Sequence, residues 1–136
     1  MTLFVDTNIF LRYITSDDLD KQAACAALFE RAKSGEIDLI TSDVVIAEIV
    51  HVLSSQRLYN LKREAVFEAV NLILGMPGLR VQNRQVCVRA VYLYAYHNID
   101  FADALIGAFM ENDGVDTVMS YDKHMDRIST IKRVEP

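Results

Sequence analysis

Short apolar segments alternate with longer segments of helical periodicity along this chain, and no other feature constrains its fold as strongly. The apolar segments are followed by helical patterns instead of hairpin turns. Strands that are separated by helices pair in parallel, and helices then cover both faces of the sheet. The sequence therefore predicts an α/β fold with a parallel sheet, and its expected strands are residues 3–5, 38–41, 79–82, 116–120 and 131–134.

The expected helices have recognisable beginnings and ends. Aspartate, serine and threonine are favoured at helix N-caps, and glycine commonly follows the last helical residue. These signals predict helices over 8–13, from the 17–20 acidic cluster to about Gly35, 42–55, 61–74, 86–96 and from Asp100 to about Gly114. Repeats, low-complexity tracts and linker-like segments are absent, so a single domain over residues 1–136 is expected.

Composition limits the classes of function. The net charge of −5 and the isoelectric point near 5.1 argue against a general nucleic-acid coat, which usually carries a basic surface. They leave room for an enzyme that binds phosphates through a cation. Cys25 and Cys87 lack the spacing of a metal site and are expected to be reduced packing residues. With no apolar run of ~20 residues and no basic segment before an apolar one, we expect no membrane span and a cytoplasmic protein.

Acidic residues follow two of the expected strands directly. Asp6 follows the first, in LFVDTNIFL, and Asp122 follows the fourth, in TVMSYD. Asp6 has two interpretations, because aspartate is a good helix N-cap and because ligands bind beyond the carboxyl ends of parallel strands. The same placement of Asp122 favours the second interpretation.

Two further acids interrupt apolar helical faces. On a helical wheel, Glu48 falls between Val44 and Val52, so we expect it to be buried, where a carboxylate must be paired, protonated or bound to a metal. Asp103 lies among apolar residues of the helix that Asp100 is expected to cap. We expect Gly107, one turn further on, to leave space beside the Asp103 carboxylate.

Asp6, Glu48, Asp103 and Asp122 can all be gathered at one end of a parallel sheet. Four ionised carboxylates in one place repel one another and raise one another's pKa, and a divalent cation relieves this repulsion. Ligands that are all oxygen favour Mg²⁺ or Mn²⁺ over Zn²⁺. Such an ion can activate water and neutralise charge on a phosphate during an in-line displacement.

At these residues the sequence resembles the PIN-domain nucleases, and among them the small VapC-type toxin ribonucleases of toxin–antitoxin pairs. The resemblance runs through VDTNIFL, SDVVIAEIV, DFADALIGAF, VMSYDKHMDRI and the final IKRVEP. It implies a three-layer fold with a central parallel sheet of about five strands and with Asp6 on the central strand. It also implies hydrolysis of RNA phosphodiester bonds that depends on Mg²⁺ or Mn²⁺, an antitoxin partner and a homodimer.

The resemblance also implies a role for each acid. Asp6 and Asp103 would hold the metal directly, whereas Glu48 and Asp122 would ligate it directly or through water. Polar neighbours would orient these groups, and rim cations would contact the substrate phosphate. The neighbours are Thr7, Asn8 and Ser120, the rim cations are Arg12 and Lys123, and His124 stands where many relatives carry a second acid.

Three alternatives are weighed against this interpretation. Glu48 and His51 have the Glu-x-x-His spacing of di-iron bundles, but no second pair accompanies them. A haloacid-dehalogenase-like phosphatase needs an acid where this chain has Asn8. A catalytically inactive PIN-fold scaffold that binds RNA or a protein partner remains the main rival, and it should show no metal-dependent gain in stability.

Overall fold

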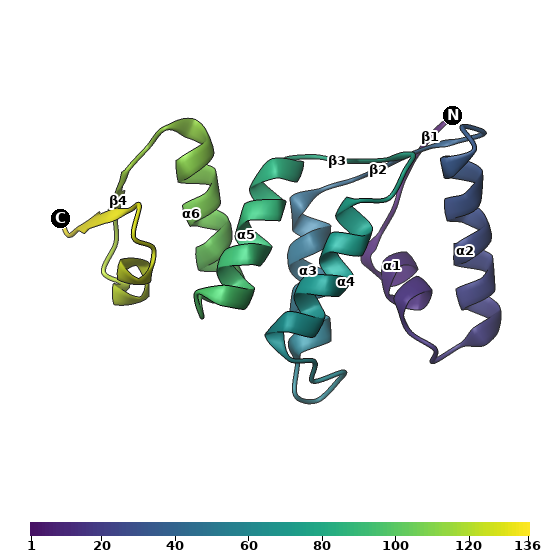
Figure 1. Cartoon of the computed structure of the whole chain (residues 1–136), viewed down its shortest axis with the longest axis horizontal. Helices are drawn as coiled ribbons and strands as arrows, with labels where there is room; N and C mark the ends of the chain where they lie inside the picture. The colour runs from purple at the N-terminus through teal and green to yellow at the C-terminus, as the bar shows by residue number, and fades with distance from the viewer.

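The computed structural model describes residues 1–136, and its elements follow the predicted order (Figure 1). Every expected helix and strand is present, with boundaries shifted by a few residues at most, and a short 3₁₀ helix is added. The α/β fold class is confirmed. The elements are β1 (Thr2–Phe4), α1 (Thr7–Ile14), α2 (Leu19–Lys33), β2 (Asp38–Thr41), α3 (Asp43–Ser54), α4 (Arg63–Leu74), β3 (Leu79–Val81), α5 (Arg84–Tyr96), α6 (Phe101–Asp113), β4 (Thr117–Met119), η1 (Lys123–Arg127) and β5 (Lys132–Val134).

The five strands form two separate parallel sheets, and in this respect the expectation of one sheet of about five strands is wrong. One sheet has the order β1-β2-β3, and the other consists of β4 and β5. The two sheets lie towards opposite ends of the long axis, with helices between them (Figure 1). Because β4 pairs with β5 and not with β1, Asp6 follows an edge strand and not the central strand that the resemblance implied.

The core is a continuous cluster of apolar side chains between the three-stranded sheet and its helices. Its most deeply buried members come from α1, β2, α3, α4, α5 and α6. The helices contribute one apolar face each, as amphipathic periodicity requires. The largest fully buried side chains include Phe10, Leu39, Ile46, Ile49, Leu53, Ile73 and Leu93.

Arg63, the first residue of α4, holds the corner between α5 and α6. Its Nη1 donates hydrogen bonds to the carbonyl oxygens of Tyr94, at 2.6 Å, and Ile99, at 2.9 Å. Its guanidinium lies 4.3 Å from the centre of the Tyr94 ring, and its Nη2 is 3.6 Å from an oxygen of Asp100. A side chain that is distant in sequence therefore fixes the path of the chain between two helices.

The β4–β5 sheet is attached to the rest of the molecule through α6. Arg89 of α5 donates to both carboxylate oxygens of Glu111 in α6, at 2.8 and 3.3 Å, and Thr130 donates to Glu111 at 2.7 Å. Gly107 lets α6 approach the segment before β5, because a Cβ there would lie 2.6 Å from Ile128 Cδ1. Gly107 is therefore explained by packing, and the expectation that it leaves space beside Asp103 is wrong.

Two smaller observations complete the fold. Cys25 and Cys87 are buried and unpaired, as expected, and burial together with the charge of Asp43 raises the pKa of the Cys87 thiol to about 12. Among the helices, none combines the length and the apolar character needed to cross a bilayer.

Candidate functional site

Asp6 and Glu48 are joined through Thr7. Asp6 is the N-cap of α1, and its Oδ1 accepts a hydrogen bond from the Thr7 amide at 2.7 Å. The buried Thr7 hydroxyl donates to Glu48 Oε2 at 3.0 Å. Asp6 is thus a helix cap, as its residue type predicted, and it also lies beside a second carboxylate from α3. We call Asp6, Thr7 and Glu48 the N-terminal acidic group.

Glu48 is exposed, so the prediction that it is buried is wrong. The helical wheel placed it correctly between Val44 and Val52, but no element covers this side of α3. Val44, one turn earlier, is 71% exposed although it is apolar. A wheel shows which residues share a face of a helix, and it does not show whether another element packs there.

Asp103, Asp122 and His124 form a second cluster, which we call the C-terminal acidic group. Carboxylate oxygens of the two aspartates and a ring nitrogen of His124 lie within 4.8 Å of one another. His124 Nδ1 is 3.0 Å from Asp122 Oδ1, and the His124 amide donates to the same oxygen at 2.9 Å. Asp103 comes from the first turn of α6, whereas Asp122 follows β4 and caps η1.

Burial raises the pKa of Asp103, and the negative charges of Asp122 and Asp100 raise it further, while His124 lowers it. This is the response expected of a carboxyl group that is partly desolvated beside like charges. A cation bound here would relieve the repulsion, although clusters of surface carboxylates also occur without one. Of the three residues in this group, Asp103 is the one whose side chain is partly buried, whereas Asp122 and His124 are exposed.

The neighbouring acids have structural partners. Asp100 stands at the N-cap of α6 as predicted, but its side chain contacts Arg63 instead of a helix amide. Asp126 is exposed and lies 3.1 Å from Arg133. These two acids are explained without a ligand.

Of the polar residues that the resemblance placed around the site, one contacts an acidic group and others lie elsewhere on the surface. Ser120 Oγ accepts a hydrogen bond from the Asp122 amide at 2.9 Å, so it orients the C-terminal group. Asn8 and Arg12 line a hollow between α1 and α2, and Lys123 begins η1. The sequence did not assign His124 a contact with Asp122, although a histidine two residues after an acid at a helix start is within reach of it.

The four predicted acids are thus brought together in pairs within one chain. Asp6 and Glu48 form one pair and Asp103 and Asp122 the other, and neither Asp6 nor Glu48 belongs to the cluster of ligand atoms around Asp103. Their roles as metal ligands stay a prediction.

Comparison with known proteins connects these residues to a family. The model of the PIN domain matches residues 3–131, which include both acidic groups. The chain belongs to the PIN domain family.

Individual relatives of this PIN domain match along almost its whole length. A VapC ribonuclease of Aquifex aeolicus (strain VF5) is 24% identical over 132 residues, which cover 97% of this chain and 95% of the relative. VapC ribonuclease Mb1869c of Mycobacterium bovis and Ribonuclease VapC13 of Mycobacterium tuberculosis are each 28% identical over 134 residues, covering 97% of this chain and 98% of each relative. The similarity therefore runs along almost the whole fold.

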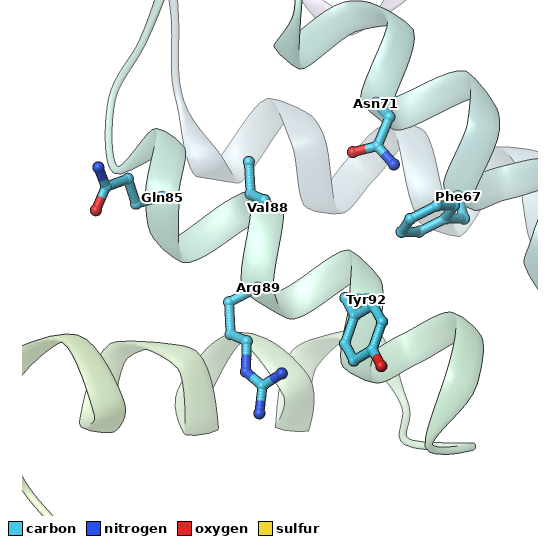
Figure 2. A pocket seen from close by; sticks show the side chains of 6 residues that line it. All are labelled: Phe67, Asn71, Gln85, Val88, Arg89 and Tyr92. Atoms are coloured by element: carbon cyan, nitrogen blue, oxygen red, sulfur yellow. The ribbon is translucent and has the colours of Figure 1, made fainter.

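One surface hollow of this PIN domain is separate from both acidic groups. It lies between α4 and α5, has a volume of about 550 Å³ and contains no carboxylate (Figure 2). Tyr92 and Arg89 are neighbours along α5, while Phe67 and Asn71 face them from α4 (Figure 2). Because the hollow is largely apolar and remote from the acids, its size does not mark it as the site of phosphate chemistry.

Proposed function

We propose that this protein hydrolyses RNA phosphodiester bonds with the help of a divalent metal ion, and that it is the toxin of a toxin–antitoxin pair. The full-length similarity to relatives that are named VapC ribonucleases carries the proposal. The similarity runs along both halves of the chain and includes the segments with Asp6, Glu48, Asp103 and Asp122. It therefore supports assigning the ribonuclease function of these relatives to this protein.

The donor set suits a hard cation. The four acids offer carboxylate oxygens, which Mg²⁺ and Mn²⁺ prefer, and His124 adds a nitrogen that Mn²⁺ tolerates better than Mg²⁺ does. Burial raises the pKa of Asp103, and the neighbouring charges of Asp122 and Asp100 raise it further. We expect Asp103 and Asp122 to hold the ion there, with Asp6 and Glu48 contributing from the N-terminal group.

The chemistry follows from the residue types. A bound cation would supply a more acidic water and would neutralise charge on the phosphate. The protein would orient its carboxylates through fixed donors: the Thr7 hydroxyl for Glu48, and the His124 amide for Asp122. Such hydrogen bonds hold ligand oxygens in one orientation and so raise affinity for the ion.

A small antitoxin is the expected protein partner. Its binding segment should carry cationic side chains, because the two acidic groups leave this surface negative and the chain as a whole has a net charge of −5. The antitoxin would then compete with the metal or the RNA for the same carboxylates.

The test is cleavage of a mixed structured RNA by the purified protein in Mn²⁺, Mg²⁺ or EDTA. Asp6→Asn and Asp103→Asn remove one ligand from each acidic group and keep the shape of the side chain. We expect cleavage only with a metal, and a loss of at least about 100-fold in both variants, because even indirect partners of a ligand commonly contribute 10–100-fold. Asp113→Asn, at the exposed end of α6, is the matched control and should cleave like the wild type.

A thermal melt with and without Mn²⁺ separates the proposal from the scaffold alternative. A metal that binds only the folded protein raises the melting temperature, and the rise grows with the logarithm of the ion concentration once that concentration exceeds the dissociation constant. This rise should disappear in Asp103→Asn. If RNA is bound but never cut, and Mn²⁺ leaves the melting temperature unchanged, the protein is a scaffold and not a nuclease.

A further inference from the structure

A hollow of about 530 Å³ lies between α3, the start of α4 and the first turn of α6. We call it the α3–α6 hollow. Glu48 belongs to α3 and Asp103 to the first turn of α6, so the hollow touches one helix from each acidic group. Ala47 and Ala102, which directly precede these two acids, both line it. A ligand in the α3–α6 hollow would therefore lie beside the carboxylates to which we assign the phosphate chemistry.

Lys62 gives the α3–α6 hollow an uncompensated positive charge. Of the side chains that line it, Lys62 and Arg63 are cationic and Asp100 is the single acid. Arg63 lies 3.6 Å from an oxygen of Asp100, so these two charges offset each other. Lys62 is exposed and belongs to none of the ion pairs of the structure. In a chain with a net charge of −5, this hollow is a place where a phosphate group is attracted instead of repelled.

The other walls of the hollow suit the base of a nucleotide. Six of the eleven lining residues are hydrophobic, and the buried rings of Tyr94 and Phe101 are among them. His51 is exposed at the hollow, and an imidazole ring can stack on an unpaired base. The Ser54 hydroxyl donates to the His51 carbonyl at 3.3 Å, so its oxygen can still accept a hydrogen bond from a base. Stacking rings and hydrogen-bonding groups are the means by which proteins bind single-stranded RNA.

The size and the charge of the hollow favour a nucleotide over a protein segment. Its volume of about 530 Å³ lies within the range of about 300–1,000 Å³ that is typical of sites for small ligands. The expected antitoxin segment is cationic, so Lys62 would repel it, whereas this lysine attracts the backbone of RNA. A base inside an RNA helix is stacked and paired, so the occupant that fits is an unpaired nucleotide.

We propose that the α3–α6 hollow binds an unpaired nucleotide of the RNA substrate beside the scissile phosphate. Lys62 contacts the phosphate of this nucleotide, His51 stacks on its base, and Ser54 accepts a hydrogen bond from it. The hollow thus sets the affinity for single-stranded RNA, while the two acidic groups perform the hydrolysis. That this nucleotide neighbours the bond that is cut rests on the proposed function; that the hollow binds single-stranded RNA does not.

The salt dependence of RNA binding tests the role of Lys62. The Asp6→Asn chain, which is expected to leave RNA intact, is titrated with a fluorescent single-stranded RNA of mixed sequence in Mg²⁺, and anisotropy gives Kd at several KCl concentrations. Each phosphate contact contributes about 0.7 to the slope of log Kd against log salt concentration for a single strand. Adding Lys62→Met should weaken binding and lower this slope by about 0.7. Adding Lys33→Met, which removes an exposed charge at the end of α2, should leave both unchanged.

Two substitutions at His51 test the stacking contact. His51→Ala in the Asp6→Asn chain should raise Kd by at least about 5-fold, because a base stacked on an aromatic ring contributes that much or more to affinity. His51→Phe keeps a ring and should bind RNA like the Asp6→Asn chain itself. An RNA duplex of the same sequence should compete poorly for that chain, because its bases are paired.

Cleavage by the active chain separates this inference from the proposed function. In that background Lys62→Met and His51→Ala should raise KM and leave kcat nearly unchanged, because the contacts that they remove are made before and during the reaction alike. Unchanged Kd and KM in both variants would overturn the inference, as would the absence of RNA binding by the Asp6→Asn chain. If both variants weaken RNA binding but the wild type never cuts RNA, the proposed function fails and the hollow remains an RNA-binding site.

Discussion

The N-terminal and C-terminal acidic groups hold their carboxylates in different ways. Thr7 supplies an amide to Asp6 and a hydroxyl to Glu48, so the N-terminal pair is oriented by an uncharged, buried side chain. In the C-terminal group, both contacts of His124 serve Asp122, while burial and like charges raise the pKa of Asp103. The first group is arranged in advance, and the second retains a repulsion that a cation would relieve.

The largest expected effect comes from removing one charge in each group. Glu48→Gln and Asp122→Asn should each reduce metal-dependent RNA cleavage by at least about 100-fold, since we propose that carboxylates of both groups act on the bound ion. Cleavage rates under single-turnover conditions measure this. Equal losses support joint action, and a loss confined to Asp122→Asn would mean that the N-terminal group is a helix cap with a neighbouring glutamate.

A smaller effect is expected from the donor that orients Glu48. Thr7→Val keeps the shape of the side chain and removes the hydroxyl, so it should lower cleavage by about 10- to 100-fold and stability by about 1 kcal/mol. Thr7→Ser keeps the hydroxyl and should retain most of the activity. Rate measurements and urea unfolding on both variants test this prediction, which fails if the valine and serine variants cleave alike.

The smallest effect concerns pH. The pKa of Asp103 is raised in the folded protein, so the folded state binds this proton at a higher pH than the unfolded chain does. An ionised Asp103 therefore destabilises the metal-free protein above the raised pKa, and the penalty disappears as the pH falls through it.

Asp103→Asn should accordingly melt slightly above the wild type at neutral pH in EDTA, and the difference should shrink in acid. Melting curves at neutral and acidic pH, with Asp113→Asn as control, provide the measurement. A difference of the same size at both pH values would assign it to the amide side chain and not to the charge.

The sequence predicted local structure well because the signals for it are local. The sequence placed the N-cap of α3 at Thr41 or Ser42 and the end of α6 near Gly114, and the structure has Ser42 at the first position and Gly114, in a left-handed conformation, at the second. The acids after β1 and β4 were recognised because ligands bind beyond the carboxyl ends of parallel strands. Pairing between distant strands leaves no such local signal, so the division of the sheet could not be predicted.

The errors at the site have the same cause. The exposure of Glu48 depends on whether another element covers α3, and the need for Gly107 depends on Ile128, which follows twenty-one residues later. Neither fact is contained in the periodicity of a helix. The positions of the four acids after strands and on apolar helix faces identified them, the resemblance to the PIN family suggested their roles, and the structure added their division into two groups.

Arg63 has a consequence for how mutational scans of this protein are interpreted. Its planar guanidinium bonds two carbonyl groups and stacks on Tyr94 at the same time, a combination that a lysine ammonium does not reproduce. Position 63 should therefore reject even lysine, a pattern of intolerance that is usually assigned to catalytic arginines. In this protein, intolerance at position 63 would instead reflect the role of Arg63 in fixing the angle between α5 and α6. An assay of folding alone would separate this structural role from a catalytic one.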